Sequence, residues 1–271
     1  MNLGYACINM TLSEQKPKVT TNRSMIKKTF LAKGPEYAGE LALLNSRDLF
    51  EILKWNRENG VKFFRLSSDL FPWASEYNIE DLPQYGRIKT ILSGCGHYAK
   101  KHKIRITSHP GPFNVLVSPR EHVVKNTITD LTNHGKVFDL LGLDRSPYNK
   151  INIHCNGVYG DKASALNRFC ENFELLPESV KTRLTVENDD KASMYSVKDL
   201  MYIHKRIGIP IVFDYHHHQF CTGDLTEQEA LELAITTWPE NVKPVVHYSE
   251  SKSLHESNEK IKPQAHSDYI N

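Results

Sequence analysis

Polar side chains suited to metal and phosphate chemistry stand at the ends of six short apolar runs in this chain. They are Asn9, His109, His154, Glu187, Asp214 and His247. A single histidine at the end of a strand is more often a hydrogen-bonded structural residue than a ligand. Several histidines that recur with a glutamate and an aspartate are hard to explain in that way. The pattern predicts a cluster of divalent ions in which Glu187, central in the strand order, is the bridging carboxylate.

The expected chemistry of such a cluster is hydrolysis of a phosphodiester. Metal ions about 3.5–4 Å apart can clamp the attacking and leaving oxygens and generate a hydroxide nucleophile at neutral pH. Mixed histidine and carboxylate ligands permit Zn²⁺ or Mn²⁺ and do not favour Mg²⁺ alone. This chemistry requires that the chain bring the ligands together, and the predicted elements show how it can do so.

Short apolar runs alternate with longer amphipathic stretches, which predicts strands that alternate with helices. The predicted strands are Leu3–Ile8, Lys62–Leu66, Arg105–Ser108, Lys150–His154, Leu184–Glu187, Pro210–Asp214 and Val245–Tyr248. The predicted helices are Ser46–Asn59, Arg87–His102, Pro119–Leu141, Lys162–Phe173, Ser196–Ile207 and Thr226–Thr237. This order implies parallel strands covered by helices, and about seven such units fit an α/β TIM (β/α)₈ barrel. In a barrel the carboxyl ends of the strands surround one mouth, where the polar residues would meet.

We expect a single TIM-barrel domain over residues 1–271, because no internal repeat, low-complexity segment or Pro/Gly/Ser linker divides the chain. An eighth strand is not visible before the sequence stops at Asn271. Either the barrel lacks its last strand or the chain is a piece of a longer protein, and we favour the second explanation. The stretches Leu12–Thr29 and Leu66–Leu82 are expected to be loops at the rim.

Composition predicts a soluble intracellular protein with a sizeable core. Hydrophobic residues make up 39% of the chain and charged residues 24%. The net charge of +2 excludes a histone-like basic protein but permits binding of nucleic acid through a local patch. Five scattered cysteines argue for a reducing compartment and against a zinc ribbon. The sequence shows neither a signal peptide nor an apolar run long enough to span a membrane.

Several segments of the chain follow one another in an order known from one protein family. They are Leu3–Asn9, Thr20–Arg23, Phe64–Ser68 with Phe71-Pro72, His109–Gly111, Val186–Asp189 and Asp214–His217. Together they resemble UV damage endonuclease, a family of metal-dependent TIM barrels related to endonuclease IV. The resemblance implies a DNA repair enzyme that nicks damaged double-stranded DNA 5′ of cyclobutane dimers, 6-4 photoproducts and abasic sites. It also implies a monomer that is found with the DNA, in the cytoplasm or nucleoid or in the nucleus.

The resemblance also implies a set of metal ligands. They are His109, His154, Glu187, Asp214, His217, His247 and His266. Of these, Glu187, His109 and Asp214 are expected to be catalytic, with two or three ions and Mn²⁺ as the first choice ahead of Zn²⁺ or Mg²⁺. The family histidine stands three residues after the aspartate, which selects His217. Its neighbours His216 and His218 are expected behind the ligands or at the rim, in a triplet that continues a strand.

A second set of residues is expected to recognise the damaged duplex. Tyr5 and Asn9 match family residues that line the damage pocket, and Pro112-Phe113 replaces the Gln-Tyr pair with which the family probes the duplex. Phe113 can still wedge between bases, but the hydrogen bonds of the amide are lost. Arg23 and Arg65 are expected to meet phosphates. For Trp73 two alternatives stay open, insertion into the base stack and anchoring of a loop.

Two departures from the family pattern concern the metal ions. The family carries a lysine, usually carboxylated, two residues before the histidine of the seventh strand, where this chain has Val245. Valine cannot bind a metal, so one site is weaker, supplied by another acid such as Glu250, or filled by water. The last glutamate ligand of the family would lie on an eighth strand, beyond Asn271.

Three other functions are compatible with these residues. An abasic-site nuclease resembling endonuclease IV would use the same chemistry, although the segments Leu3–Asn9 and Thr20–Arg23 favour the UV enzyme. A metal-dependent sugar isomerase or epimerase would share the barrel and a site of histidines and acids. A binding protein without metals would account for Val245 and the missing strand.

Overall fold

A computed structural model describes residues 2–270, which form two compact units. Within the described residues, unit 1 comprises residues 2–111, 128–151 and 177–183, and unit 2 comprises residues 112–127, 152–176 and 184–270. The prediction that residues 1–271 form one domain stays a prediction. Asn271, where the sequence stops, lies outside the described residues.

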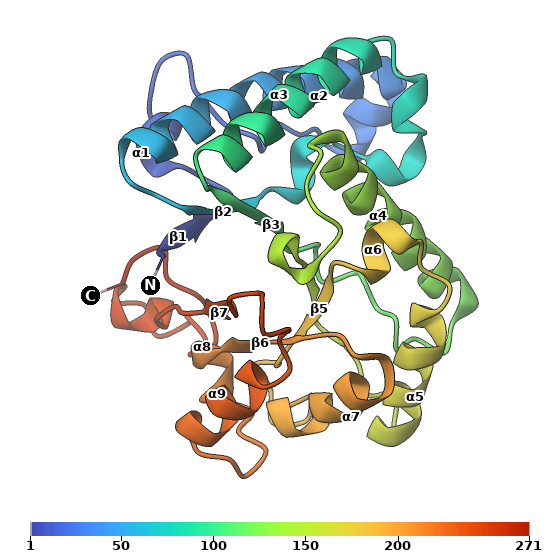
Figure 1. Cartoon of the computed structure of the whole chain (residues 1–271), viewed down its shortest axis with the longest axis vertical. Coiled ribbons are helices and arrows are strands. Elements are labelled where there is room, and N and C mark those ends of the chain that lie inside the picture. Colours follow the sequence, from blue (N-terminus) through green and yellow to red (C-terminus); the bar gives the residue numbers. More distant parts are fainter. Residues whose placement is uncertain (1, 271) are drawn as a thin grey trace. The chain divides into compact units, whose positions relative to one another are not determined.

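Unit 1 is built on parallel strands that follow one another in chain order. Strand β1 (Gly4–Ala6) pairs with β2 (Phe63–Leu66), and β2 pairs with β3 (Arg105–Ser108). Ser108 is then opposite Ile151, the first residue of β4 (Ile151–Ile153). Helices α2 (Lys27–Glu58) and α3 (Tyr85–Lys101) lie side by side over these strands (Figure 1).

Unit 2 contains the rest of β4 and three further strands. Strand β5 (Leu184–Glu187) pairs with β6 (Ile211–Asp214), and β6 pairs with β7 (Val246–His247), again in parallel. All residues of β5 and β6 are buried, as expected of strands covered on both faces. The outer layer of this unit contains α5 (Lys162–Phe173), α7 (Val197–Ile207) and α9 (Glu227–Ile235) (Figure 1).

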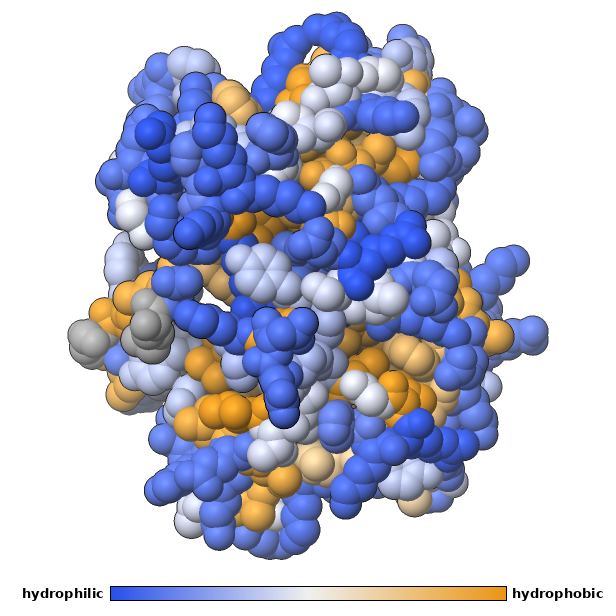
Figure 2. All heavy atoms as spheres, in the orientation of Figure 1, coloured by the Kyte–Doolittle hydropathy of each residue, from blue (hydrophilic) through white to orange (hydrophobic). Residues whose placement is uncertain are grey.

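The remaining helices are three short ones and α4, whose residues belong partly to each unit. They are α1 (Met10–Ser13), α4 (Glu121–Leu140), α6 (Glu178–Lys181) and α8 (Tyr215–His218). On the face seen in Figure 2, polar side chains cover most of the surface and apolar atoms show between them. Among the described residues, every helix is too short or too polar to cross a bilayer.

The predicted fold class, an α/β fold of the TIM-barrel type, is confirmed by parallel strands that occur in chain order with helices between them. Strands Arg105–Ser108 and Leu184–Glu187 and helix Lys162–Phe173 have the predicted bounds. The described residues contain seven strands, and after β7 they add only an isolated antiparallel bridge between Ser251 and His266.

One predicted helix begins in the wrong place. The pattern predicts Ser46–Asn59, whereas α2 begins at Lys27 and is interrupted at Gly34, which has φ of 68°. Pro35 follows this glycine, and a proline lacks the backbone donor that a continuous helix needs. The kink and the lysine-rich first turn hide the helical periodicity of this part, although it buries Phe30 and Ala38. The stretch expected as a loop from Leu12 to Thr29 therefore contains the last two residues of α1 (Met10–Ser13) and the start of α2.

Candidate metal centre

Glu187 is the point on which three histidines of unit 2 converge. It is the last residue of β5 and is 1% exposed. His247 Nδ1 lies 2.9 Å from its Oε2, and His217 Nδ1 and His154 Nε2 lie 3.6 and 3.9 Å from its Oε1. Asn152 donates a hydrogen bond to Oε2. The fold thus brings four of the expected ligands to the carboxyl ends of neighbouring strands.

A helical turn places His217 beside Asp214. The expectation that the histidine triplet continues a strand is wrong, because β6 ends at Asp214 and Tyr215–His218 form α8. The Asp214 side chain caps this turn by accepting a hydrogen bond from the backbone N–H of His217 (2.9 Å). A helical turn brings residues i and i+3 onto one side, so His217 faces back toward the acid. Ligand atoms of Glu187, Asp214 and His217 all lie within 4.8 Å of one another.

The other two histidines of the triplet are buried. His216 and His218 are 1% and 4% exposed, so neither lies at a solvent-exposed rim. The ring centroid of His216 is 5.0 Å from that of His266 and 6.5 Å from that of His217, which places His216 behind the ligands. The ring of His218 packs on Phe213, with centroids 5.3 Å apart. Burial lowers the pKa of both imidazoles.

His266 reaches the site from the segment that follows β7. The bridge to Ser251 holds it in place, and Ser249 Oγ lies 2.6 Å from its Nδ1. Its Nε2 faces His217 Nε2 at 3.0 Å, while His217 Nδ1 lies 2.8 Å from the Asn188 carbonyl and donates to it. Burial, followed by the neighbouring His217 and His216, lowers the pKa of His266 to about 4, so its imidazole is neutral.

This donor set fits a divalent cation. Two imidazoles whose Nε2 atoms face each other, with Nδ1 of each hydrogen-bonded elsewhere, present the arrangement in which histidines bind metal. The carboxylates of Glu187, Asp189 and Asp214 crowd negative charge beside these imidazoles, which raises the pKa of neighbouring groups. Burial and the neighbouring Glu187 raise the pKa of Asp214 to about 7. Burial alone would lower the pKa of His154, but Glu187, Asp189 and Asp214 outweigh it and raise the pKa to about 9. A bound cation would offset the negative charge that raises the pKa of Asp214 and of His154.

His109, the remaining expected ligand, lies in unit 1 directly after β3. Its carbonyl accepts a hydrogen bond from Ser68 Oγ (3.3 Å), and its Nδ1 lies 3.2 Å from the carbonyl oxygen of Pro110. Its participation in a metal cluster stays a prediction.

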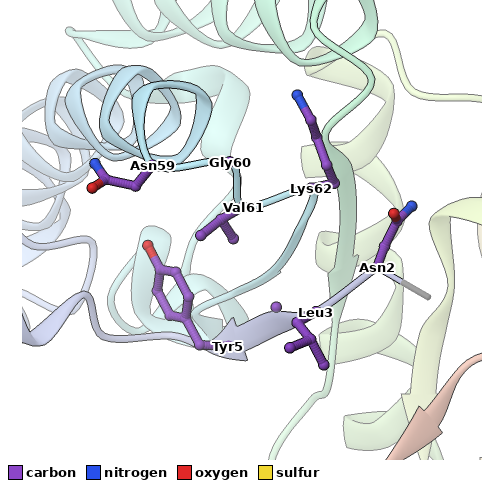
Figure 3. Close-up of a pocket in the computed structure, with 8 residues that line it drawn as sticks. Asn2, Leu3, Tyr5, Asn59, Gly60, Val61 and Lys62 are labelled. Carbon is purple, nitrogen blue, oxygen red and sulfur yellow. The ribbon is translucent and has the colours of Figure 1, made fainter.

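Tyr5 and Asn9 lie together in unit 1. Asn9 Nδ2 donates to the Tyr5 hydroxyl (2.8 Å), which donates to Asn56 Oδ1 on α2 (2.6 Å). Figure 3 shows Tyr5 beside a pocket formed where β1 and β2 begin, lined by Asn2–Tyr5 and Asn59–Lys62. This pocket lies at the amino ends of β1 and β2 and is lined by none of the expected metal ligands.

The cations and aromatics expected to bind DNA have different surroundings. Arg23 is tied to its own unit through Asp48 Oδ2 (2.7 Å) and the Thr20 carbonyl (2.7 Å). The buried Arg65 Nε has no hydrogen-bond partner among the described residues. Trp73 donates to the Met25 carbonyl (2.9 Å) and stacks on Phe30, with ring centroids 5.3 Å apart.

These contacts of Trp73 favour the loop-anchor alternative. Phe113, which follows Pro112 in unit 2, is 88% exposed and is therefore accessible to a partner. The roles of all these residues in recognition stay predictions.

Some residues of the site were missed in the sequence. Asp189 Oδ1 lies 3.3 Å from His154 Nδ1, and Asn152 donates to Glu187 and accepts a hydrogen bond from Thr185. Asn152 precedes His154 by two residues and Thr185 precedes Glu187 by two, a spacing that places each pair on one face of its strand. This spacing of two residues is the signal by which Asn152 and Thr185 could have been found in the sequence.

Val245, which stands where the family has a lysine, is 8% exposed. Glu250, the acid expected as a substitute ligand, lies with its Oε2 2.7 Å from His255 Nε2.

Comparison with known proteins gives one consistent family. Residues 1–271 match the family model of the UV-endonuclease UvdE. The chain is 36% identical to a UV-damage endonuclease of Schizosaccharomyces pombe, over 99% of this chain and 45% of that protein. It is 33% identical to a UV DNA damage endonuclease of Bacillus cereus strain G9842, over 100% of this chain and 82% of that protein.

Among solved structures, the crystal structure of SacUVDE matches with a TM-score of 0.86 and 33% identity, over 100% of this chain and 86% of that one. The chain spans less than half the length of the fungal relatives that it matches.

Proposed function

The chain belongs to the UV-endonuclease UvdE family, and on this premise we propose that it is a metal-dependent DNA repair endonuclease. Its substrate is damaged double-stranded DNA, which it nicks 5′ of cyclobutane dimers, 6-4 photoproducts and abasic sites. The observation that carries the proposal is the convergence of His154, His217 and His247 on the buried carboxylate of Glu187. The named activity of the relatives supplies the substrate class.

The ligands divide into groups that can hold more than one ion. Glu187 has two carboxylate oxygens with different imidazoles beside them, so it is suited to bridge neighbouring ions. Asp214, His217 and His266 form one group, and His154 approaches Glu187 from β4. The ions, two or three with Mn²⁺ as the first choice, would polarise the phosphodiester and supply a hydroxide nucleophile. His109 completes the proposed set, and Glu187, His109 and Asp214 are the proposed catalytic residues.

The chain itself orients these ligands. The Asn188 carbonyl accepts the Nδ1 proton of His217 and so leaves Nε2 as the metal-binding nitrogen. Val245 supplies no ligand, and Glu250 is paired with His255. We therefore propose that the ion next to Val245 has one protein ligand fewer than in the family pattern.

Damage recognition is assigned to the exposed Phe113 and to three residues of unit 1 that are partly or fully buried. Phe113 presents an apolar ring that can insert beside a distorted base pair, where damage has already reduced the cost of unstacking. Arg65 is proposed to meet a phosphate, and Tyr5 and Asn9 are proposed to line the damage pocket. The enzyme would act as a monomer inside the cell, where the DNA is.

Nicking of plasmid DNA tests this function. Supercoiled plasmid is irradiated, depurinated or left intact, and each sample is incubated with the full chain and Mn²⁺, with and without a chelator. We expect relaxation of the irradiated and depurinated plasmids only, and only when metal is present. Cleavage confined to abasic DNA would indicate an activity like that of endonuclease IV. Absence of nicking from all three plasmids at saturating Mn²⁺ would refute the proposed nuclease.

A further inference from the structure

Thr185, Asn152 and Glu187 form a buried chain of hydrogen bonds that ends at the central carboxylate. Thr185 Oγ1 donates to Asn152 Oδ1 (2.7 Å), and Asn152 Nδ2 donates to Glu187 Oε2. Asn152 and Thr185 are fully buried, and Glu187 is 1% exposed. At this depth bulk water cannot replace a lost partner, so each bond is costly to break.

The strand period explains why these three side chains meet. Side chains at positions i and i+2 of a strand point to the same face, so Thr185 stands one layer below Glu187 on β5. In the same way, Asn152 on β4 stands one layer below His154, which directly follows this strand. The residues two positions before the other two ligands are apolar: Val212 precedes Asp214 on β6, and Val245, just before β7, precedes His247. Polar side chains therefore stand two residues before His154 and Glu187, and valines stand two residues before Asp214 and His247.

The hydroxyl of Thr185 sets the direction of the amide. A threonine O–H that donates to the Asn152 oxygen leaves the NH₂ group facing Glu187. If the amide were reversed, its oxygen would lie against a carboxylate oxygen and the contact would be repulsive. Thr185 therefore acts on Glu187 through Asn152.

We propose that Asn152, oriented by Thr185, is a positioning residue that fixes the Glu187 carboxylate for a divalent cation. The amide donor occupies one lone-pair direction of Oε2 and adds no charge, so Oε1 and the rest of Oε2 stay available on the side of His217 and His247. This inference rests on the proposed function to the extent that Glu187 binds a divalent ion.

The test is a titration of the metal-stripped full chain with Mn²⁺ by calorimetry, for the wild type and four variants. Asn152→Leu removes the amide at similar volume and should weaken Mn²⁺ binding roughly 10- to 100-fold, as expected for groups that orient metal ligands. Thr185→Val should weaken it less, and Thr185→Ser should restore it. In nicking assays Asn152→Leu should lower kcat while KM for DNA changes little.

Asn149→Leu is the matched control. Asn149 is buried and donates to the Ile106 carbonyl (2.9 Å) in unit 1. Its loss should lower the melting temperature and leave the affinity for Mn²⁺ unchanged. This separates a general loss of stability from a loss of ligand orientation.

An affinity of Asn152→Leu within twofold of the wild type would overturn the inference and leave the proposed function standing. If Asn152→Leu shows no cooperative melting transition, the decision falls to Thr185→Val and Thr185→Ser. Equal affinity of those two variants then overturns the inference, and weaker binding by Thr185→Val alone supports it. A wild type that binds no Mn²⁺ would overturn the proposed function together with the inference.

Discussion

Asp189 lies against the ring of His154, with Oδ1 3.3 Å from Nδ1, while Nε2 of the same ring lies 3.9 Å from Glu187 Oε1. The acid is itself held in place, because its backbone N–H donates to the Tyr195 carbonyl (2.9 Å) and its Oδ2 accepts from the Tyr195 N–H (3.3 Å). A carboxylate on one nitrogen of an imidazole fixes the ring and directs the other nitrogen to a metal. Asp189 is therefore expected to orient His154 and to favour its charged form when metal is absent.

Asp189→Asn should lower the pKa of His154 in the metal-free protein from about 9. Burial already opposes the imidazolium, and the substitution removes one of the negative charges that outweigh this effect. The measurement is an NMR titration of the His154 ring protons. Asp190→Asn removes the neighbouring acid and is the matched control. A pKa of His154 that is the same in Asp189→Asn and the wild type would exclude this role.

Much of the fold could be predicted because its signals are local. Continuous apolar runs such as Ile211–Phe213 are typical of strands buried on both faces, and β6 ends at Asp214 as predicted. The missed start of α2 depends on packing, since lysine-rich residues around Gly34 and Pro35 become helical only when Phe30 and Ala38 are buried. Tertiary burial thus outweighed the local pattern there.

The residue types of the site could be predicted more easily than their arrangement in space. The resemblance to the family suggested Asp214 and His217 as ligands, but no local pattern indicated that a capped helical turn brings them together. His266 follows no strand of its own and reaches the site through the bridge to Ser251, a long-range contact without a local pattern. Supports such as Asn152 are found only when the strand register is known.

The metal-free protein should lose stability as the pH rises from about 7 to 9. The pKa of His154 is raised above its unfolded value of 6.5, so its stabilising effect is fully present below pH 6.5 and is lost as the pH rises through about 9. His266, whose pKa is lowered to about 4, contributes to the slope only below pH 6.5 and so does not disturb this window.

The measurement is chemical unfolding at pH 7, 8 and 9 in the presence of chelator, for the wild type and His154→Gln. The variant should show the smaller decrease in unfolding free energy. The affinity for Mn²⁺ should increase as the pH rises, because the metal must displace the protons of His154 and Asp214. Equal slopes for the wild type and the variant would contradict the assignment to His154.

Glu187→Gln should abolish nicking and leave the fold intact. The substitution keeps the volume and one acceptor oxygen but removes the charge that offsets the cations, so a loss of about 10³-fold in kcat or more is expected. Circular dichroism and a cooperative melting transition check the fold, and calorimetry checks the number of bound ions. Glu250→Gln is a matched control, since Glu250 pairs with His255. Nicking by Glu187→Gln at the wild-type rate would remove Glu187 from the catalytic set.

Phe113→Ala should reduce the preference for damaged DNA more than the rate of cleavage. The ring is 88% exposed, so its loss should leave stability nearly unchanged, whereas insertion beside a lesion needs its apolar surface. The measurement is the ratio of kcat/KM on irradiated and intact duplexes of one sequence. Leu175→Ala, at a residue that is 61% exposed, is the control. An unchanged ratio would rule out the wedge.

Substitution of Trp73 can distinguish its two alternative roles, anchoring of a loop and insertion into the base stack. Its backbone is left-handed, with φ of 59°, a conformation that costs about 1–2 kcal/mol for a residue other than glycine and must be offset by packing. The stack on Phe30 and the bond to the Met25 carbonyl supply that packing. If Trp73 is an anchor, Trp73→Ala should destabilise the protein by about 2–3 kcal/mol, less than for a fully buried tryptophan. Trp73→Phe, which can keep the stack, should lose about 1 kcal/mol.

Both variants of Trp73 should nick irradiated plasmid normally at a temperature where they are folded. Unfolding in urea gives the free energies, and the plasmid assay at 15 °C below each melting temperature gives the activities. If instead Trp73→Ala unfolds like the wild type but loses its preference for irradiated DNA, the ring acts on the base stack and the anchor assignment is wrong.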